Sequence, residues 1–237
     1  MLGRVRVAEK EIGGGKARAL LVALLMEANR MTSVDRLVDA LWEDEPPASA
    51  VANVRTHVCT LRRLVGDTGT LVSHPGGYEL VVPEGTCDAT AFSARADAGR
   101  AALADGRAEQ ACGLLQGALA LWGADRAAVG VPRGGWLAAR LGYLDEERRR
   151  AVEDFAEASL RVGEPRAALR DLAALLAVDP LRTRSWALRM RAHHRLGEQG
   201  GVKEAMREAA GLFRAQLGAP VDTSLVRLHD DLCRSGS

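Results

Sequence analysis

The sequence predicts a mainly α-helical protein in which a winged helix-turn-helix domain is followed by a domain of paired helices. Three observations support this fold class. Residues 48–82 have the pattern of one long helix followed by two short strands. After residue 88 only helix patterns occur. In that second region, residues 160–164 resemble residues 194–198, which lie 34 positions further along the chain.

Length and charge limit the possible organisation. The 237 residues exceed the usual size of one domain, and a linker containing Pro and Gly divides them into residues 1–83 and 87–237. Lys and Arg total 32 and Asp and Glu total 31, so the formal net charge is +1. A protein this close to neutral has no overall basic field. Any DNA binding must therefore come from positive charge that is placed locally.

Cysteine usage and hydropathy predict a cytoplasmic protein. The four cysteines form no C-x-x-C pair and match no zinc-site spacing; they are Cys59, Cys87, Cys112 and Cys233. Free thiols are typical of an intracellular location. No apolar segment is long enough to cross a membrane. We expect no membrane association, no cofactor and no metal.

The first part of the chain predicts a strand and two helices. Residues 2–7 alternate in polarity and predict a short strand, and residues 16–28 predict the first helix. Thr32 or Ser33 caps a second helix. Its spacing predicts an inward face made of Val34, Leu37, Val38, Leu41 and Trp42.

An acidic segment and two prolines end this second helix. Pro46 and Pro47 cannot continue it. The residues before them are Glu43, Asp44 and Glu45. Phosphate repels carboxylates, so we do not expect this segment to face DNA. Two interpretations remain open, a contact with a basic protein surface and a solvated loop.

The segment from Ala48 to Gly66 predicts a helix with two distinct faces. Its apolar stripe has the spacing i, i+4, i+7 and i+11 and consists of Val54, Val58, Leu61 and Val65. The opposite face is polar, and no acidic residue occurs in the segment. A turn at residues 75–77 then separates two predicted strands, residues 71–73 and 78–82.

This layout is typical of a winged helix-turn-helix, in which the helix enters the major groove and the hairpin lies against the neighbouring minor groove. Because Asn suits adenine and Arg suits guanine, we assign four side chains to base edges: Asn53, Thr56, Thr60 and Arg63. Arg55, His57 and Arg62 are assigned to phosphates. The alternative is a surface helix packed on a hairpin, with arginines that are merely solvated.

The region after residue 88 predicts a tetratricopeptide-like array. Gly163 and Gly197 lie 34 residues apart, which is the period of such repeats, and Asp179-Pro180 stands where one repeat ends. Stacked helix pairs form a concave surface for protein partners. An irregular helical bundle is the alternative. Within this region, residues 145–150 are three acids followed by three arginines, and their i to i+3 and i to i+4 spacings predict a solvated, self-paired helix face.

Nothing in the sequence predicts an enzyme. None of the five histidines has a Cys, Asp or Glu at a spacing suited to a metal site or a catalytic triad. No hydrolase, metalloprotease or dinucleotide-binding motif is present. We therefore expect no catalytic residues.

Three motifs carry a family resemblance. They are VDRLVDALWEDEPP at residues 34–47, the helix end V-x-x-L-R-R-L-V-G at residues 58–66, and P-G-G-Y at residues 75–78. With them, the first domain resembles the winged helix of the Streptomyces antibiotic regulatory proteins, which is similar to the OmpR-type DNA-binding domain. Residues 91–103 and 227–232, with the repeats between them, resemble the bacterial transcriptional activation domain of that family.

The resemblance implies a transcriptional activator of an antibiotic or other secondary-metabolite gene cluster. Family members bind direct repeats near promoters as side-by-side protomers and recruit RNA polymerase holoenzyme, which implies at least a homodimer on DNA. His74 falls at the wing position where the family often has a minor-groove arginine. Residues 43–45 fall in the loop that contacts polymerase in the wider fold.

A second hypothesis is a protein–protein interaction module. In that case the tetratricopeptide-like domain would bind a partner, and the winged helix would serve for docking without specific DNA binding. Salt-sensitive binding to duplex DNA distinguishes the two hypotheses, because a pure interaction module lacks it.

Overall fold

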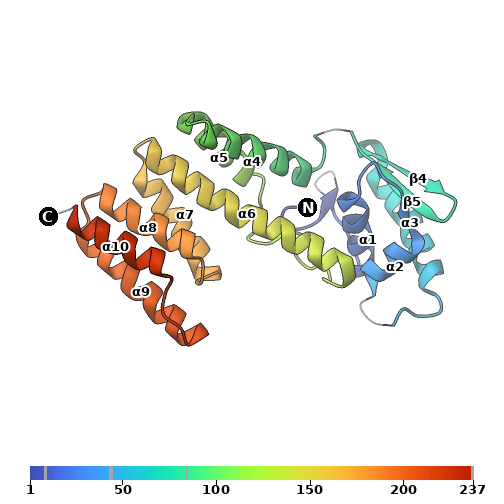
Figure 1. The fold of residues 1–237 in the computed structure, drawn as a ribbon. Coiled ribbons are helices and arrows are strands. Elements are labelled where there is room, and N and C mark those ends of the chain that lie inside the picture. Colours follow the sequence, from blue (N-terminus) through green and yellow to red (C-terminus); the bar gives the residue numbers. More distant parts are fainter. Residues whose placement is uncertain (8–9, 43–44, 84, 236–237) are drawn as a thin grey trace. The chain divides into compact units, whose positions relative to one another are not determined.

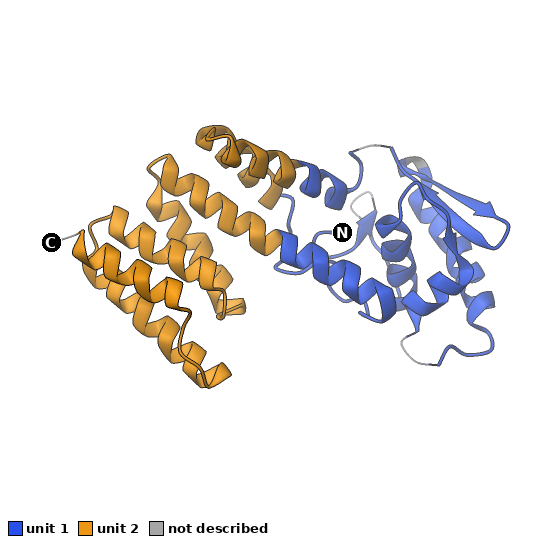
Figure 2. Ribbon diagram, viewed as in Figure 1, with its two compact units in different colours: residues 1–94, 120–147 blue, residues 95–119, 148–237 orange. Residues whose placement is uncertain are grey.

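The computed structural model describes residues 1–7, 10–42, 45–83 and 85–235. It is mainly helical, as predicted from the sequence, and Figure 1 shows the order of its elements. The described chain forms two compact units, which Figure 2 distinguishes by colour. Unit 1 comprises Met1–Ala94 and Ala120–Glu147, and unit 2 comprises Arg95–Leu119 and Arg148–Ser237. Part of the region that the sequence assigns to the second domain therefore contributes to unit 1.

The beginning of the chain forms less strand than the sequence predicts. Of the predicted strand, only Arg6 and Val7 form β1 (Arg6–Val7), which pairs with β2 (Lys10–Glu11) in an antiparallel ladder. The residues before β1 bond instead to a distant loop of unit 1. Gly123 N donates to Leu2 O at 2.7 Å, and Val129 N donates to Gly3 O at 2.8 Å. The prediction of a strand over residues 2–7 is wrong for its first half because these backbone groups find their partners outside any sheet.

Three helices form the core of unit 1, namely α1 (Gly15–Met26), α2 (Val34–Leu41) and α3 (Ala50–Val65). The Ser33 side chain accepts a bond from Arg36 N, which confirms one of the two predicted caps. Trp42 was predicted to face inward, but it lies beyond the end of α2 and is only half-buried. There the Lys16 ammonium lies 4.5 Å from the centre of its ring.

The predicted hairpin is present and gains a third strand. Strands β4 (Thr70–His74) and β5 (Gly77–Val81) form the wing, and β3 (Thr32–Ser33) pairs with the other edge of β5. The sequence pattern missed β3 because two residues are too few to show alternation. A Cβ atom on Gly77 would lie 2.5 Å from Thr32 O, so this close pairing requires glycine.

Residues 120–147 complete unit 1. The long helix α6 (Gly135–Arg161) begins there. The Trp136 indole Nε1 donates a hydrogen bond to Arg36 O at 2.8 Å. The Arg36 guanidinium lies 4.2 Å from the centre of the same ring. Leu137 and Leu141, on the same part of α6, are fully buried. The start of α6 therefore packs on α2.

The predicted solvated charge run at residues 145–150 is wrong at its beginning. Asp145 and Glu147 are 5% and 7% exposed. The Asp145 carboxylate accepts bonds from Ala127 N and Arg133 Nη1, each at 2.7 Å. Through these bonds the carboxylate holds the loop before α6 in place, and its burial is tolerated because its oxygens are hydrogen-bonded. Pairings within one helix do not reveal such a long-range role.

The remaining helices form pairs with closely similar turns. They are α4 (Asp88–Ala104), α5 (Ala108–Leu119), α7 (Pro165–Val178), α8 (Thr183–Arg195), α9 (Gln199–Leu217) and α10 (Thr223–Arg234). In three turns, the backbone N–H of one residue donates a hydrogen bond to the backbone carbonyl five positions earlier. These bonds join Arg107 N to Ala102 O at 2.8 Å, Glu164 N to Ser159 O at 2.8 Å and Glu198 N to His193 O at 2.9 Å. Each turn has a glycine with positive φ, at positions 106, 163 and 197. The turns at Gly163 and Gly197 confirm the 34-residue repeat, and the turn at Gly106 has the same bond pattern.

A buried polar cluster joins α6 to α8 inside unit 2. The Glu153 carboxylate is 3% exposed and accepts from Arg182 Nε at 3.1 Å and Nη2 at 2.9 Å, and from Ser185 Oγ at 2.7 Å. One turn further along α6, Glu157 accepts from Arg184 at 2.8 Å. Burial alone would raise the pKa of Glu157, but hydrogen bonds and charge from Arg184 and Arg161 lower it below its ordinary value.

Candidate nucleic-acid interface

Helix α3 is fixed in unit 1 by its apolar stripe. Val54, Val58, Leu61 and Val65 are all buried, as the spacing predicts. The rest of the helix faces outward. Arg55, Thr56, Cys59, Arg62 and Arg63 are exposed, and Asn53, His57 and Thr60 are half-buried. The structure therefore brings the seven predicted residues of this helix to its solvent side, which we call the α3 face.

The α3 face is electropositive. Helix α3 contains no acidic residue. Arg55 and Arg63 form no ion pair with any side chain that the structure describes. Arg62 and Arg63 also stand in the last turn, where the helix dipole favours positive charge. The face thus carries positive charge that is available to an external anion, although the whole chain is nearly neutral.

The polar side chains of the α3 face are partly ordered by local hydrogen bonds. Thr56 Oγ1 donates to Ala52 O at 3.1 Å, and Thr60 Oγ1 donates to Thr56 O at 3.2 Å. Their hydroxyl protons are therefore engaged, and the oxygens keep lone pairs for an external donor. The Asn53 amide donates to Ser49 Oγ at 3.3 Å, which leaves its carbonyl oxygen available as an acceptor.

Arg62 joins the α3 face to the wing. Its Nε donates to Leu71 O at 3.1 Å, and its Nη2 donates to Ser73 Oγ at 2.7 Å. Both acceptors belong to β4. The sequence assigns Arg62 to a phosphate, and the structure adds a role inside the protein, since the guanidinium sets the position of β4 against α3.

The wing residue His74 is the last of strand β4 and pairs with Gly77 of β5. Its Nε2 lies 2.7 Å from Glu79 Oε2, and its side chain is 33% exposed. This carboxylate offsets the charge that a protonated imidazole would bring to the wing.

Asn29 contributes to the interface in a way that the sequence did not predict. It adopts the left-handed conformation with φ 62°, three residues after the end of α1. Its backbone N donates to Leu80 O at 3.0 Å, and its Oδ1 accepts from Val82 N at 2.9 Å. Asn29 therefore anchors the end of β5 to α1. The only sequence signal was an Asn at the end of a predicted helix.

Of the acidic residues predicted to contact polymerase, Glu43 and Asp44 lie outside the described residues, and Glu45 is exposed. Among the described residues, no cluster of His, Cys, Asp and Glu has the arrangement of a metal site. Within the same part of the chain, no helix combines the length and apolar character needed to span a bilayer.

Two family models match the chain. The one described as "Bacterial transcriptional activator domain" matches residues 87–233. The one described as "Transcriptional regulatory protein, C terminal" matches residues 10–79, which include α3 and most of the wing. The two models together cover most of the sequence.

Several known regulators are similar over most of this chain. Identity is 33% over 223 residues to the regulatory protein AfsR of Streptomyces griseus, covering 94% of this chain and 23% of AfsR. It is 32% over 236 residues to the transcriptional regulatory protein EmbR of Mycobacterium tuberculosis, covering 94% of this chain and 58% of EmbR. It is 31% over 232 residues to the regulatory protein DnrI of Streptomyces peucetius, covering 93% of this chain and 84% of DnrI. The chain therefore spans less than two thirds of AfsR and EmbR.

A solved structure supports the same relationship. The fold is similar to that of Mycobacterium tuberculosis EmbR in complex with a low affinity phosphopeptide, with a TM-score of 0.85 and 29% sequence identity. The match covers 98% of this chain and 64% of that chain.

Proposed function

The chain belongs to the Streptomyces antibiotic regulatory protein family of transcriptional regulators, and on that premise we propose that it binds duplex DNA sequence-specifically and activates transcription. The observation that carries the proposal is the α3 face. It presents two arginines without ion pairs among the described side chains and three ordered polar side chains beside a hairpin wing. A major groove about 12 Å wide accommodates such a helix.

The proposal divides the α3 face into two roles. Asn53, Thr56, Thr60 and Arg63 contact base edges, and Arg55, His57 and Arg62 contact phosphates. His74 contacts the minor groove beside the wing. The carbonyl oxygen of Asn53 and the lone pairs of the two threonines suit amino groups on bases. These assignments are those of the sequence, and the exposure of the α3 side chains supports them.

The wider biological role is also part of the proposal. Protomers bind side by side on direct repeats near a promoter, as at least a homodimer on DNA. They recruit RNA polymerase through the acidic residues 43–45, and the targets are antibiotic or other secondary-metabolite genes. Family membership supports these statements.

The first test is selection of bound duplexes from a random pool at two salt concentrations. We expect enrichment of two copies of a short motif in one orientation, about one helical turn apart. An inverted repeat would keep specific DNA binding but exclude the side-by-side arrangement. No enrichment at either salt concentration would favour the interaction-module hypothesis, in which unit 2 binds a protein.

Substitutions on the α3 face should separate its roles. Arg63→Ala should cost about 1–3 kcal/mol on the selected site and relax its sequence preference, because a base contact is lost. Arg55→Ala should weaken binding to every duplex and lower the slope of log affinity against log salt by about one. Fluorescence anisotropy titrations at several salt concentrations measure both quantities.

Arg62→Ala is the informative comparison. It should also weaken selected and random DNA alike. Because the guanidinium already bonds to Leu71 O and Ser73 Oγ, we expect the salt slope to change less than in Arg55→Ala. Ser73→Ala should then reproduce part of the loss. The division into base and phosphate contacts would be contradicted if Arg63→Ala, like Arg62→Ala, lost the same affinity on selected and on random DNA.

A further inference from the structure

Unit 2 has a half-open hollow of about 350 Å³ where the end of α6, the start of α7 and the end of α8 meet, and we call it the unit 2 hollow. All residues of its lining belong to unit 2, and none of them is assigned to DNA. Ligand pockets have volumes of about 300–1,000 Å³. The unit 2 hollow therefore has room for one side chain of a partner.

The apolar part of the lining is only partly covered by the protein itself. Pro165 and Leu196 line the hollow, and both are half-buried. They lie against Leu160, which is buried and belongs to the core of unit 2. An apolar side chain of a partner would cover the surface that Pro165 and Leu196 leave open to water, and this burial is favourable.

Arginines without partners stand at the rim. Arg166 and Arg195 line the hollow, and both are exposed. Arg191 is also exposed and stands four residues before Arg195 on α8, so these two side chains share one helix face. None of the three forms an ion pair with any side chain that the structure describes. Their charge is therefore available to an external anion.

The other arginines of α8 show the contrast. The helix contains no acidic residue, so its positive charge is balanced only by neighbouring helices. Arg184 lies 2.8 Å from Glu157 of α6, and Arg189 lies 2.6 Å from Glu208 of α9. These ion pairs hold the helices of unit 2 together. The arginines at the end of α8 have no such structural partner among the described residues.

One acid also lines the hollow. Glu164 is exposed and stands directly before α7, where the helix dipole favours a carboxylate. Three guanidinium groups and this one carboxylate leave a net positive charge around the unit 2 hollow. Glu164 should therefore weaken the binding of an anion there without preventing it, which gives a test with the opposite sign.

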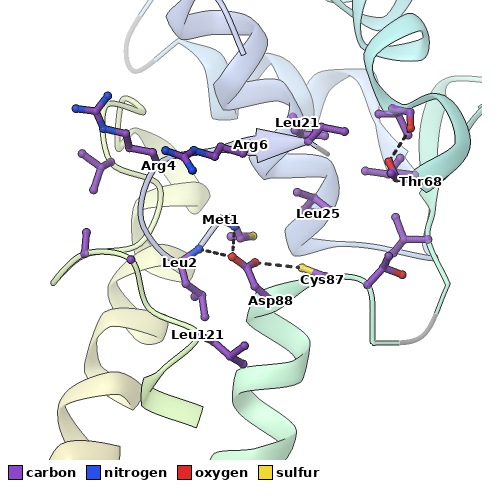
Figure 3. Close-up of a pocket in the computed structure, with 18 residues that line it drawn as sticks. Met1, Leu2, Arg4, Arg6, Leu21, Leu25, Thr68, Cys87, Asp88 and Leu121 are labelled. Atoms are coloured by element: carbon purple, nitrogen blue, oxygen red, sulfur yellow. Dashed lines mark hydrogen bonds and ion pairs between the residues drawn. The ribbon is translucent and has the colours of Figure 1, made fainter. Parts of the chain in front are cut away.

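A larger hollow in unit 1, of about 840 Å³, differs in this respect (Figure 3). Its charged groups have partners within the protein. Asp88 accepts from Leu2 N at 2.7 Å and is paired with the amino group of Met1, as Figure 3 shows. Arg4 lies 3.2 Å from Glu11. Unpaired charge at the rim thus distinguishes the unit 2 hollow from this one.

We propose that the unit 2 hollow is a docking site for an acidic peptide segment of a protein partner. An apolar side chain of the segment enters between Pro165 and Leu196, and its flanking carboxylates bind the three arginines, whose planar guanidinium groups match carboxylates. Charge complementarity selects an acidic partner over a basic one. Among the described residues no aromatic side chain lines the hollow, so it lacks the stacking platform of a single-stranded nucleic acid site.

Three labelled peptides test the site on the full chain in the absence of DNA, by fluorescence anisotropy at low salt, where screening is weak. The first is Glu-Asp-Leu-Glu-Asp, which we expect to bind saturably. The second replaces its acids by Gln and Asn, and the third replaces Leu by Ser. Both should bind at least about fivefold more weakly, because one lacks the carboxylates and the other the apolar side chain. Failure of the first peptide to bind, or equal binding of the second, would overturn the proposal.

Substitutions locate the site. The double variant R166Q/R195Q should weaken the first peptide at least about fivefold, since two charged contacts are lost. R207Q/R234Q makes the same change of net charge at exposed arginines of α9 and α10 and should alter the affinity less than twofold. Glu164→Gln should tighten binding about twofold. Circular dichroism melts check that each variant folds.

Three outcomes would overturn this assignment. Equal weakening by the two double variants would mean that only net charge matters. Weaker binding in Glu164→Gln would contradict the placement of the carboxylates beside it. Loss of affinity for a random duplex in R166Q/R195Q, with the peptide affinity unchanged, would make the surface a nucleic-acid contact instead. The peptide titrations contain no DNA, so they are unaffected if the proposed function fails.

Discussion

A fragment that ends at Pro83 should fail to hold a stable winged helix, although it contains α1, α2, α3 and the wing. The fragment lacks residues 120–147, which belong to unit 1. It thereby loses the backbone bonds that Gly123 and Val129 donate to the first residues of the chain. It also loses the indole of Trp136 from the surface of α2.

The expected loss is large compared with the stability of a small domain. Leu137 and Leu141 are fully buried in unit 1, and burying one such side chain contributes about 1.5–3 kcal/mol. The two leucines alone therefore account for about 3–6 kcal/mol, and the half-buried Trp136 adds to this loss. Whole domains are stable by only about 5–15 kcal/mol. The fragment should therefore be largely unfolded, or unfold at a much lower temperature.

Circular dichroism melts and amide NMR spectra of the fragment 1–83 provide the measurement. A fragment 1–147, which contains every residue of unit 1, serves as the matched comparison and should recover dispersed amide signals. Trp136→Ala in the full chain should destabilise unit 1 in the same direction, but by less. A cooperative melt of fragment 1–83 as high as that of the full chain would show that residues 120–147 contribute little.

Replacing the buried acid of unit 2 should have the second-largest effect. Glu153→Gln keeps the shape of the side chain but removes its charge, and the Arg182 guanidinium, 16% exposed, loses the nearer of two carboxylates, since Asp179 lies at 3.5 Å. Breaking a buried ion pair costs about 3–5 kcal/mol when the remaining charge has no other partner, so the contact with Asp179 should place the loss toward the lower end of that range. Ser185, fully buried, also loses its charged acceptor. We expect the midpoint of urea unfolding of unit 2 to fall accordingly.

Glu208→Gln is the control for this prediction. Glu208 pairs with Arg189 at 2.6 Å, but its side chain is 40% exposed. Exposed pairs contribute about 0–1 kcal/mol, so this variant should unfold almost like the parent. If both variants lost the same small stability, the Glu153 cluster would not be the link between α6 and α8 that its burial indicates.

Local patterns predicted the parts of the fold that depend on neighbours in sequence. The apolar stripe from Val54 to Val65 is buried as its spacing requires, and the predicted turn at residues 75–77 joins β4 to β5. The glycine turns at residues 163 and 197 also followed from a short repeat. In each case the determining contacts lie within a few residues or one repeat of the chain.

Long-range pairings explain what the sequence could not show. Nothing near Asp145 indicates that it bonds to the backbone of Ala127. Likewise, Thr32 gives no sign that it pairs with Tyr78 in the wing. The α3 face was predictable as a surface, whereas the bond from Arg62 to Ser73 depends on how the helix meets the hairpin. Such contacts are decided by tertiary packing.

The discontinuous makeup of unit 1 has a consequence for protein synthesis. Domains generally fold as units while the chain leaves the ribosome, beginning with the N-terminal one. Here the segment that completes unit 1 ends at residue 147, well after the wing has been translated. A premature stop codon between the wing and that residue would release an unfinished unit 1. Such a product would be cleared by proteases, and it would not occupy operators in place of the complete regulator.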